Sequence, residues 1–518
     1  MLTSKSSEKK VLKKYKNLLT NEEVKKIIEL SREGNSKFEE VIDDFIEKKY
    51  NVRIISELLD KGNGRSNISE EYKNLLKDSK ISKKKLNFII NKIKFYMRKR
   101  RSENFKKNGR IAKAYTKRAD RTHLKKILKH KLTEHMILLN PGPVTTSLEV
   151  KNAIVNHDIC HRDSDFEKIM ENLKRNSLKI FDADGNYSTV FISGSGTSGV
   201  EAAISSTIPP DKKLMVISNG VFGERIAEIV ELHNISMLHI KKKWGDVFNL
   251  EEMEDILKSN PDIFGIAMVH HETSIGILNP ISSIGKLSSK YGKLFIVDAI
   301  SSLGAEDLSV RKDNIDICIT SSNKCLHSFS GVTVICINNR IWNLIENVKP
   351  RVYYLDLKKY YNYSKSNQTP YTPFVASFFA LDKAIQELLE EGIEQRKLKY
   401  MELNFIMKLE LSKLGFEFFT NTGSESRTIL TVKIPEGIDF KKMYELLKQK
   451  GFIIYDSKPP LQGKYFQIAN MGAINKKTVY NFIFTLKEVL REAGFSLESN
   501  QKVYRPPHLS FDLLDVNV

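Results

Sequence analysis

The sequence lacks any run of about 18 consecutive apolar residues, the length that a membrane-spanning helix requires. Its first residues, MLTSKSSEKKVLKKYKNLL, are basic but contain neither the apolar segment nor the small-residue cleavage site of a secretory signal. A hydrophobic fraction of 41% and a charged fraction of 28% are ordinary for globular proteins. We therefore expect a cytoplasmic protein without a membrane partner, and its 518 residues suffice for two or three domains.

Cysteine is scarce as well. The sequence has four cysteines, with no CxxC pair and no histidine at the spacing of a zinc finger. Neither a disulfide framework nor a structural metal site is therefore expected. We interpret Cys160, Cys318, Cys325 and Cys336 as reduced thiols that mostly pack in the core.

Basic residues outnumber acidic ones only in the N-terminal part of the chain. Residues 1–135 hold 38 of the 83 basic side chains and 18 of the 63 acidic ones, so they carry the whole net charge of +20. This change of composition predicts a domain boundary near residue 135. The capping-box pattern of Thr20 and Glu23, followed by apolar residues at helical spacing, favours a mainly helical extension.

The role of this extension stays open. From Ile81 onward it is densely basic, with Phe95, Tyr96, Phe105 and Tyr115 interspersed. Such a segment can bind nucleic acid or another polyanion, because its cations neutralise phosphates and release counterions. The alternative interpretation is a solvated helical linker, and no specific DNA-binding signature decides between the two.

After residue 137 short apolar runs alternate with helical segments. This pattern predicts buried parallel strands with crossover helices, and hence a doubly wound α/β domain over residues 136–384. A long helix and three further apolar runs predict a smaller α+β domain over 385–495, followed by a tail at 496–518. The runs predicted as strands of the large domain are LMVISNG (214–220), IFGIAMVH (263–270), KLFIVDA (293–299), IDICITSS (315–322) and GVTVICI (331–337).

Unusual residues follow several of these runs, where ligands bind in open α/β sheets. Ser193–Gly199 precede a helix, so glycines and free backbone N–H groups can hold an anion there. Asp298 places a carboxylate at the end of an apolar strand, where an unpaired charge is costly. Lys324 follows another apolar strand, and a desolvated lysine is an amine nucleophile toward carbonyls. The segment HHETSIG (270–276) closes a fourth strand.

Each of these features alone also fits a structural role, such as a turn, a cap or core packing. Together, in this order, they provide what pyridoxal 5′-phosphate (PLP) requires. These are a phosphate cradle, a carboxylate for the pyridinium nitrogen and a lysine for the Schiff base.

From about Met136 to Gly472 the sequence resembles the 2-aminoethylphosphonate–pyruvate aminotransferases of the class V, fold-type I group of PLP enzymes. The matching segments occur in the family's order, and residues 1–135 lie outside them. They are LLNPGPVTTS (138–147), DICHRDSDF (158–166), SGSGTSGVEA, SNGVFGERI, AMVHHETSIGILNP, IVDAISSLGAE, SSNKCLH and YLDL (354–357).

The resemblance implies catalytic roles for Lys324 and Asp298. Lys324 would carry the cofactor and then move a proton between the substrate and the cofactor, and Asp298 would pair with the pyridine nitrogen. Ser195, Gly196 and Thr197 would bind the cofactor phosphate.

Four further residues receive cofactor-binding roles by the same resemblance. Phe222 would stack on the ring, Thr273 would hydrogen-bond to the ring hydroxyl, and Asn323 would point toward the phosphate. Thr372, in PYTPF, would reach the phosphate of a neighbouring subunit, which implies a homodimer with shared active sites. Ordinary core packing of Phe222 and a helix cap at Thr372 are the alternatives.

The small domain departs from the family pattern at one position. Relatives usually carry an arginine that grips the substrate carboxylate, whereas this chain has Gln467 there, which brings no charge and no bidentate guanidinium. A weaker grip or another basic residue is therefore expected. We take Gln467 and Arg351 as candidate substrate-binding residues, with Arg225 as a second candidate cation for a phosphonate. His161 and Arg162 are expected near the pocket entrance.

The predicted reaction interconverts 2-aminoethylphosphonate plus pyruvate with phosphonoacetaldehyde plus L-alanine. Two alternatives remain open at this point. One is a class V aminotransferase for another small amine or amino acid, such as alanine with glyoxylate. The other is a PLP-sensing transcriptional regulator, which the basic extension and Gln467 favour, although residues 1–135 show no clear winged-helix pattern.

Overall fold

The computed structural model describes residues 136–155, 158–246, 248–419 and 423–493, which belong to one compact unit. The predictions for residues 1–135 and 496–518 lie outside these residues. Within the described residues no helix is both long and apolar enough to cross a membrane.

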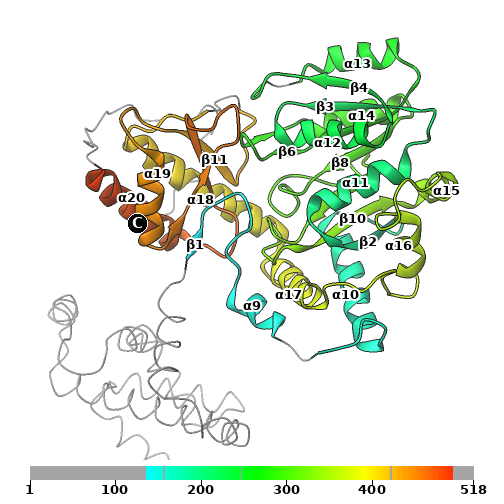
Figure 1. Cartoon of the computed structure of the whole chain (residues 1–518), viewed down its shortest axis with the longest axis horizontal. Helices are drawn as coiled ribbons and strands as arrows, with labels where there is room; N and C mark the ends of the chain where they lie inside the picture. The colour runs from blue at the N-terminus through cyan, green and yellow to red at the C-terminus, as the bar shows by residue number, and fades with distance from the viewer. Residues whose placement is uncertain (1–135, 156–157, 247, 420–422, 494–518) are drawn as a thin grey trace, which may run out of the picture. The chain divides into compact units, whose positions relative to one another are not determined.

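A seven-stranded sheet forms the centre of the larger part of this unit (Figure 1). All five strands expected there from the sequence are present. The structure adds a strand at each end of the sheet. All neighbours are parallel except β10, which runs antiparallel to both β2 and β9. In spatial order the strands are β2 (Tyr187–Gly194), β10 (Gly331–Asn338), β9 (Ile317–Ser321), β8 (Leu294–Asp298), β5 (Ile263–Val269), β3 (Lys213–Ser218) and β4 (Ser236–Lys241).

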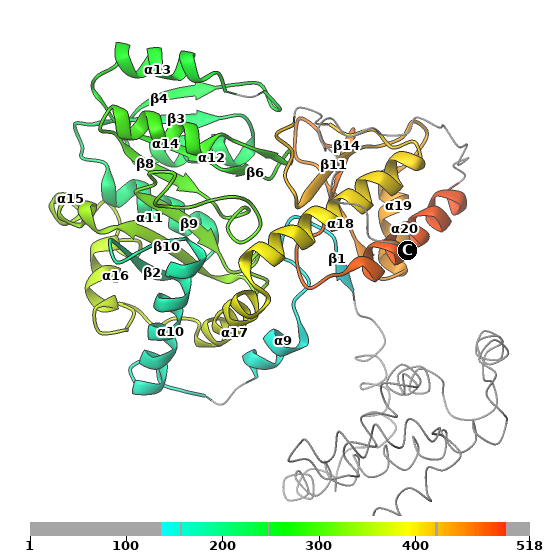
Figure 2. The ribbon, with the colours of Figure 1, turned by 180° about the vertical axis from the view of Figure 1, so that it is seen from behind.

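Helices cover both faces of this sheet, as Figures 1 and 2 show from opposite sides. Strand side chains alternate between the two faces, so Ile266 and Met268 belong to one apolar cluster while Ala267 and Val269 belong to the other. The first face packs against α10 (Ser164–Ile180), α13 (Leu250–Ser259), α14 (Ile281–Lys290) and α17 (Val375–Glu391). The second packs against α11 (Gly196–Thr207), α12 (Val221–Leu232), α15 (Trp342–Asn347) and α16 (Leu357–Ser364).

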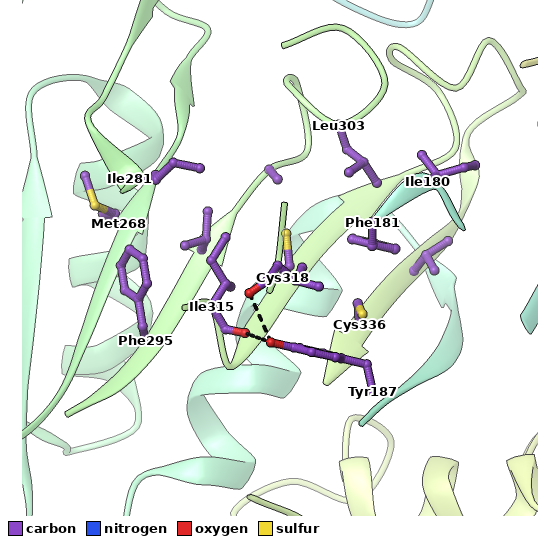
Figure 3. Packing of buried hydrophobic residues seen from close by; sticks show 14 of the residues in the cluster. Ile180, Phe181, Tyr187, Met268, Ile281, Phe295, Leu303, Ile315, Cys318 and Cys336 are labelled. Carbon is purple, nitrogen blue, oxygen red and sulfur yellow. Dashed lines mark hydrogen bonds between the residues drawn. The ribbon is translucent and has the colours of Figure 1, made fainter. Parts of the chain in front are cut away.

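The core of the first face is almost wholly apolar, and the Tyr187 hydroxyl is a paired polar group within it (Figure 3). The Tyr187 hydroxyl lies near the carbonyl oxygens of Val310, at 3.0 Å, and Ile315, at 3.2 Å. Cys318 and Cys336 lie opposite each other on neighbouring strands as free, buried thiols. Burial raises the pKa of both thiols. Cys325 is also buried and free, whereas Cys160 is exposed, so most of the cysteines pack in the core as expected.

The smaller part contains a second sheet of three strands, β11 (Ile429–Lys433), β14 (Tyr465–Ala469) and β13 (Tyr455–Asp456). The helices α18 (Ile393–Lys413), α19 (Phe440–Gln449) and α20 (Lys476–Glu492) accompany it, and all three contribute to its apolar cluster. A short strand from the other end of the described chain, β1 (Ile137–Leu138), pairs with β12 (Phe452–Ile453).

The position of β1 corrects one detail of the expected organisation. The sequence placed the segment after residue 136 at the start of the large domain, but Ile137 and Leu139 belong to the apolar cluster of the smaller part. Local hydrophobic periodicity could not reveal this pairing, because its partner strand lies more than three hundred residues later in the sequence.

The helices differ in how their N-terminal N–H groups are bonded, and this difference bears on the functional site. The N-cap side chains Asn249, Asp439 and Asn475 each accept a backbone N–H of their own helix. The N-cap residues of α11 and α12, Ser195 and Gly220, provide no such side-chain bond. The N–H groups at these two helix ends therefore need other partners.

Close packing of α11 on the sheet explains its Gly199. A Cβ atom there would lie 2.3 Å from Thr333 Cγ2 and 2.8 Å from Ile319 Cγ2. We expect Gly199→Ala to lower the free energy of unfolding by about 1–3 kcal/mol, because overpacking outweighs the helix propensity gained. Urea denaturation should show this loss. Gly185→Ala is the control, since a Cβ at Gly185 meets nothing within 4 Å, and an equal loss in both variants would contradict the packing argument.

Candidate active site

A cavity opens at the carboxyl ends of the parallel strands, where the sequence predicted a ligand. Residues that follow β2, β5, β8 and β9 converge on it from separate parts of the chain. Most of the predicted site residues line this cavity, namely Ser195, Gly196, Thr197, Phe222, Thr273, Asp298, Asn323 and Lys324. Arg225, a candidate cation for the phosphonate, lines it too.

Lys324 follows strand β9 and points its amine at the loop that connects β1 with α9 (Leu148–Ile154). Its Nζ donates to the Pro141 carbonyl oxygen. The next residue, Gly142, has φ +123°, and a Cβ there would lie 2.6 Å from Lys324 Cδ, so only glycine fits. Desolvation by burial lowers the pKa of Lys324 to about 8. About a tenth of the amine is therefore unprotonated and nucleophilic at pH 7, far more than for a lysine in water.

The N-terminus of α11 forms an anion cradle at one end of the cavity. Ser195 caps this helix without a side-chain bond, which leaves backbone N–H groups and the positive end of the helix dipole free for an anion. Arg225 Nη1 donates to Thr197 Oγ1 at 3.3 Å and adds positive charge beside the cradle. Gly196 packs closely against the loop after β8, since a Cβ there would lie 2.4 Å from Ile300 Cδ1.

Asp298 ends strand β8 and provides the carboxylate of the cavity. One of its oxygens accepts the Ile300 N–H at 2.9 Å. Burial raises the pKa of Asp298 to about 7, because the charged carboxylate loses its hydration. A protonated ring nitrogen placed against Asp298 would offset this cost and keep the carboxylate charged.

Glu272 caps the N-terminus of α12, whose Phe222 lines the cavity. Its carboxylate oxygens accept the N–H groups of Phe222, at 3.3 Å, and Gly223, at 3.0 Å. Burial raises the pKa of Glu272, while these hydrogen bonds oppose the shift. The cap fixes the start of α12, where Phe222 lies with the Arg225 guanidinium 4.8 Å from the centre of its ring.

His271 was missed by the sequence analysis, although it lines the cavity. Its Nδ1 lies 3.0 Å from the Ser301 carbonyl oxygen, which can only accept, so Nδ1 carries the proton. Its Nε2 is buried and has no hydrogen-bond partner in the described part of the chain. Burial lowers the pKa of His271 to about 4, so the ring is neutral and Nε2 faces the cavity as an acceptor.

The alternation of side-chain direction along the extended segment HHETS could have indicated His271. Glu272 turns toward α12, so His271 and Thr273 turn toward the cavity. Thr273 Oγ1 donates to Ser301 Oγ at 2.6 Å, so the two cavity residues share contacts with Ser301. His270, by contrast, is buried outside the cavity lining, and its backbone N–H donates to the Asp298 carbonyl oxygen.

Gln467, the predicted substrate-binding residue of the small sheet, does not line the cavity. It is 2% exposed, and its Nε2 donates to the Thr273 carbonyl oxygen at 2.7 Å and to Thr431 Oγ1 at 3.3 Å. Both amide hydrogens are therefore engaged. Gln467 thus connects the loop after β5 to the small sheet by hydrogen bonds. It has no N–H left to donate to a substrate carboxylate.

Other predicted residues also lie outside the cavity of this chain. Arg351 Nη1 donates to the Ser205 carbonyl oxygen at 3.0 Å, near the end of α11 that is distant from the anion cradle. Thr372 is exposed on the loop before α17. His161 is absent from the lining, and Arg162 donates to the Thr369 carbonyl oxygen at 2.7 Å, so it supports the loop that carries Thr372.

The groups of the cavity fit PLP. The α11 N-terminus can receive its phosphate, Asp298 its pyridine nitrogen, and Lys324 its aldehyde carbon. Phe222 lines the same cavity and is available to an aromatic ring there. The unpartnered Nε2 of His271 leaves one buried acceptor that the chain itself does not satisfy, as expected of a site built for a bound group.

Comparison with known proteins agrees with this geometry. Residues 144–456 match the family model of the class-V aminotransferases. The chain belongs to this family. An uncharacterised aminotransferase of Methanocaldococcus jannaschii is 36% identical over 70% of this chain and 95% of its own. A 2-aminoethylphosphonate–pyruvate transaminase of Bacillus cytotoxicus is 32% identical over 68% of this chain and 98% of its own.

A solved structure extends the likeness to the fold. The ureidoglycine–glyoxylate aminotransferase of Bacillus subtilis has a TM-score of 0.66 and 28% identity, covering 70% of this chain and 95% of that chain. This class-V aminotransferase is thus a PLP-dependent enzyme of fold type I. The sequence-based expectations of fold, enzyme class and cofactor are confirmed.

The lowered pKa of Lys324 has a measurable consequence. Burial disfavours the ammonium form, so the free amine of the aminotransferase should grow through about pH 8 instead of the usual value of about 10.4. We expect the rate of covalent PLP uptake by cofactor-free protein to rise between pH 6 and pH 9, with a midpoint near pH 8. Absorbance after mixing, with borohydride trapping and mass mapping of Lys324, checks this. A midpoint near pH 10 would refute the desolvation argument.

Proposed function

We propose that this aminotransferase transfers the amino group of 2-aminoethylphosphonate to pyruvate, giving phosphonoacetaldehyde and L-alanine. The observation that carries the proposal is the similarity to a curated transaminase of that substrate pair over almost its whole length. The guanidinium of Arg225 in the cavity supports it, because both the cofactor phosphate and a phosphonate substrate bring negative charge.

The residues of the chain divide the work between binding and proton transfer. PLP, when bound, supplies an electron-accepting ring that weakens the bonds at the amine-bearing carbon of the substrate. Lys324 would hold the cofactor and, as a free amine, would be the base next to that carbon. Asp298 would keep the ring nitrogen protonated. The α11 N-terminus with Ser195 and Thr197 fixes the phosphate end.

The assignment is tested by the first half-reaction under single-turnover conditions. PLP-loaded wild-type protein and Lys324→Ala are mixed with 2-aminoethylphosphonate, and the absorbance of the cofactor is followed. Conversion to the amino form is expected in the wild type only, because the variant lacks the base that moves the proton. Reaction with alanine or serine but not with the phosphonate would favour another small amine. A protein that binds no cofactor would favour the regulator.

We further propose that the active enzyme is a homodimer. Thr372 lies on an exposed loop beside a group of aromatic side chains, with Tyr353 75% exposed and Phe374 59% exposed. The group adjoins the anion cradle, because the Phe374 N–H donates to Ser193 Oγ at 3.1 Å at the end of β2. Exposed aromatic patches of this kind mark protein interfaces. A second copy seated here brings Thr372 toward the phosphate end of its neighbour's cavity.

The dimer is tested by charging this patch. Phe374→Asp should give a monomer by light scattering and should weaken PLP binding by about tenfold, because a shared hydrogen bond to the phosphate is lost. Phe484→Asp is the matched control, since Phe484 is 64% exposed on α20 of the smaller part. A wild-type protein that is monomeric at micromolar concentration, or a dimer unaffected by Phe374→Asp, would argue against this interface.

A further inference from the structure

The amide of Gln467 is consumed by protein contacts, so the small sheet needs another group if it is to hold the anionic end of a substrate. The face that carries Gln467 is well defined. Thr431 and Tyr455 lie directly opposite Gln467 on the two neighbouring strands and share its face of the sheet. Thr431 Oγ1 donates to the Ile275 carbonyl oxygen at 2.9 Å, and Gln467 reaches Thr273. This face therefore looks onto the loop that lines the cavity.

Lys458 lies beside the sheet face that Gln467, Thr431 and Tyr455 share. Lys458 Nζ lies 5.7 Å from the centre of the Tyr455 ring. The lysine follows β13 in a turn, where its carbonyl oxygen accepts the N–H groups of Leu461, at 2.9 Å, and Gln462, at 3.1 Å. The backbone of Lys458 is thus fixed, while its side chain stays partly exposed.

The charge of Lys458 is available to a ligand. In the part of the chain that the structure describes, no carboxylate lies within ion-pair distance of its ammonium group. Asp456, two residues earlier, instead accepts Gln462 Nε2 at 3.2 Å. Lys458 does not itself line the cavity, but its charge acts on the group inside it. Desolvation is the main cause of the lowered pKa of Lys324, and the charges of Arg225 and Lys458 add to it.

We propose that Lys458 binds the anionic end of the substrate, in the role that Gln467 cannot fill. This inference rests on the proposed function for the identity of the anion. A lysine is a compact point charge that binds a tetrahedral phosphonate dianion from any side, whereas a planar carboxylate gains most from the fork of an arginine. The phosphonate of 2-aminoethylphosphonate is therefore the expected partner, and the carboxylate of pyruvate or alanine is the other source of the same chemistry.

The test compares Lys458→Met with wild type in the two half-reactions of the PLP-loaded full chain. We expect the half-saturating concentration of 2-aminoethylphosphonate to rise roughly 10- to 100-fold, as for a lost charge-assisted hydrogen bond. Lys458→Arg should recover most of this loss. Lys464→Met is the matched control, because Lys464 is exposed on the same loop and, unlike Lys458, is not among the main charges that act on Lys324. Its half-saturating concentration should stay at the wild-type value.

The second half-reaction separates the two anions. If only the half-saturating concentration of pyruvate rises in Lys458→Met, with the amino form of the cofactor loaded, then Lys458 holds the carboxylate. Unchanged values for both substrates in this variant, at unchanged thermal stability and cofactor absorbance, would overturn the inference and leave the proposed function standing.

Calorimetry with ethylphosphonate, which has no amine to transfer, makes the outcome independent of turnover. Wild-type protein should bind it, and Lys458→Met should lose most of the heat. Should the wild type fail to react with 2-aminoethylphosphonate but bind ethylphosphonate through Lys458, the substrate assignment is wrong and the anion site remains. Equal binding of ethylphosphonate by both proteins counts against Lys458.

Discussion

The desolvation of charged groups at the carboxyl end of one sheet is the constraint on which the site depends. Burial lowers the pKa of Lys324 to about 8 and raises that of Asp298 to about 7, so each group sits close to neutral pH and both are costly to keep charged. A cofactor with an aldehyde for the amine and a basic nitrogen for the carboxylate relieves both costs at once. The buried charges of the cavity are therefore balanced only when a cofactor is bound. The Nε2 of His271, a buried acceptor without a hydrogen-bond partner in the described residues, likewise needs a bound group.

The large sheet could be predicted because its information is local. Short apolar runs with turn residues after them gave the strands, and the residues after the runs gave Lys324, Asp298 and the α11 N-terminus. His271 was within reach of the same reasoning, since strand alternation places it beside Thr273. The pairing of β1 with β12 was not, because it joins segments that are distant in sequence. Nor could any pattern indicate that Gln467 bonds to the Thr273 carbonyl oxygen, which depends on how two sheets meet.

The contact between the loop after β5 and the smaller part fixes the position of the cavity residues on that loop. The loop after β5 is joined by backbone bonds to the segment that leads into β11 of the small sheet. Among them are Ser426 N–H to the Gly276 carbonyl oxygen, at 2.9 Å, and Leu278 N–H to the Ser424 carbonyl oxygen, at 2.7 Å. Gly276, at φ +79°, lets the loop approach Ile429 closely. The cavity residues His271 and Thr273 are therefore positioned from both sides, by β5 and by the small sheet. A change in the small sheet is transmitted to the cavity through this loop.

This coupling offers a physical reason for glutamine at position 467. A buried arginine there could not donate to Thr273 and also extend into the cavity without leaving charge and donors partly unsatisfied. Glutamine satisfies the loop with a neutral amide, and the positive charge moves to Lys458 at the edge of the same face, where water still reaches it. Holding the loop and holding the anion thus become tasks of two residues. Such a division suits a substrate whose charge lies farther from the reacting carbon than a carboxylate does, as the phosphonate of 2-aminoethylphosphonate does.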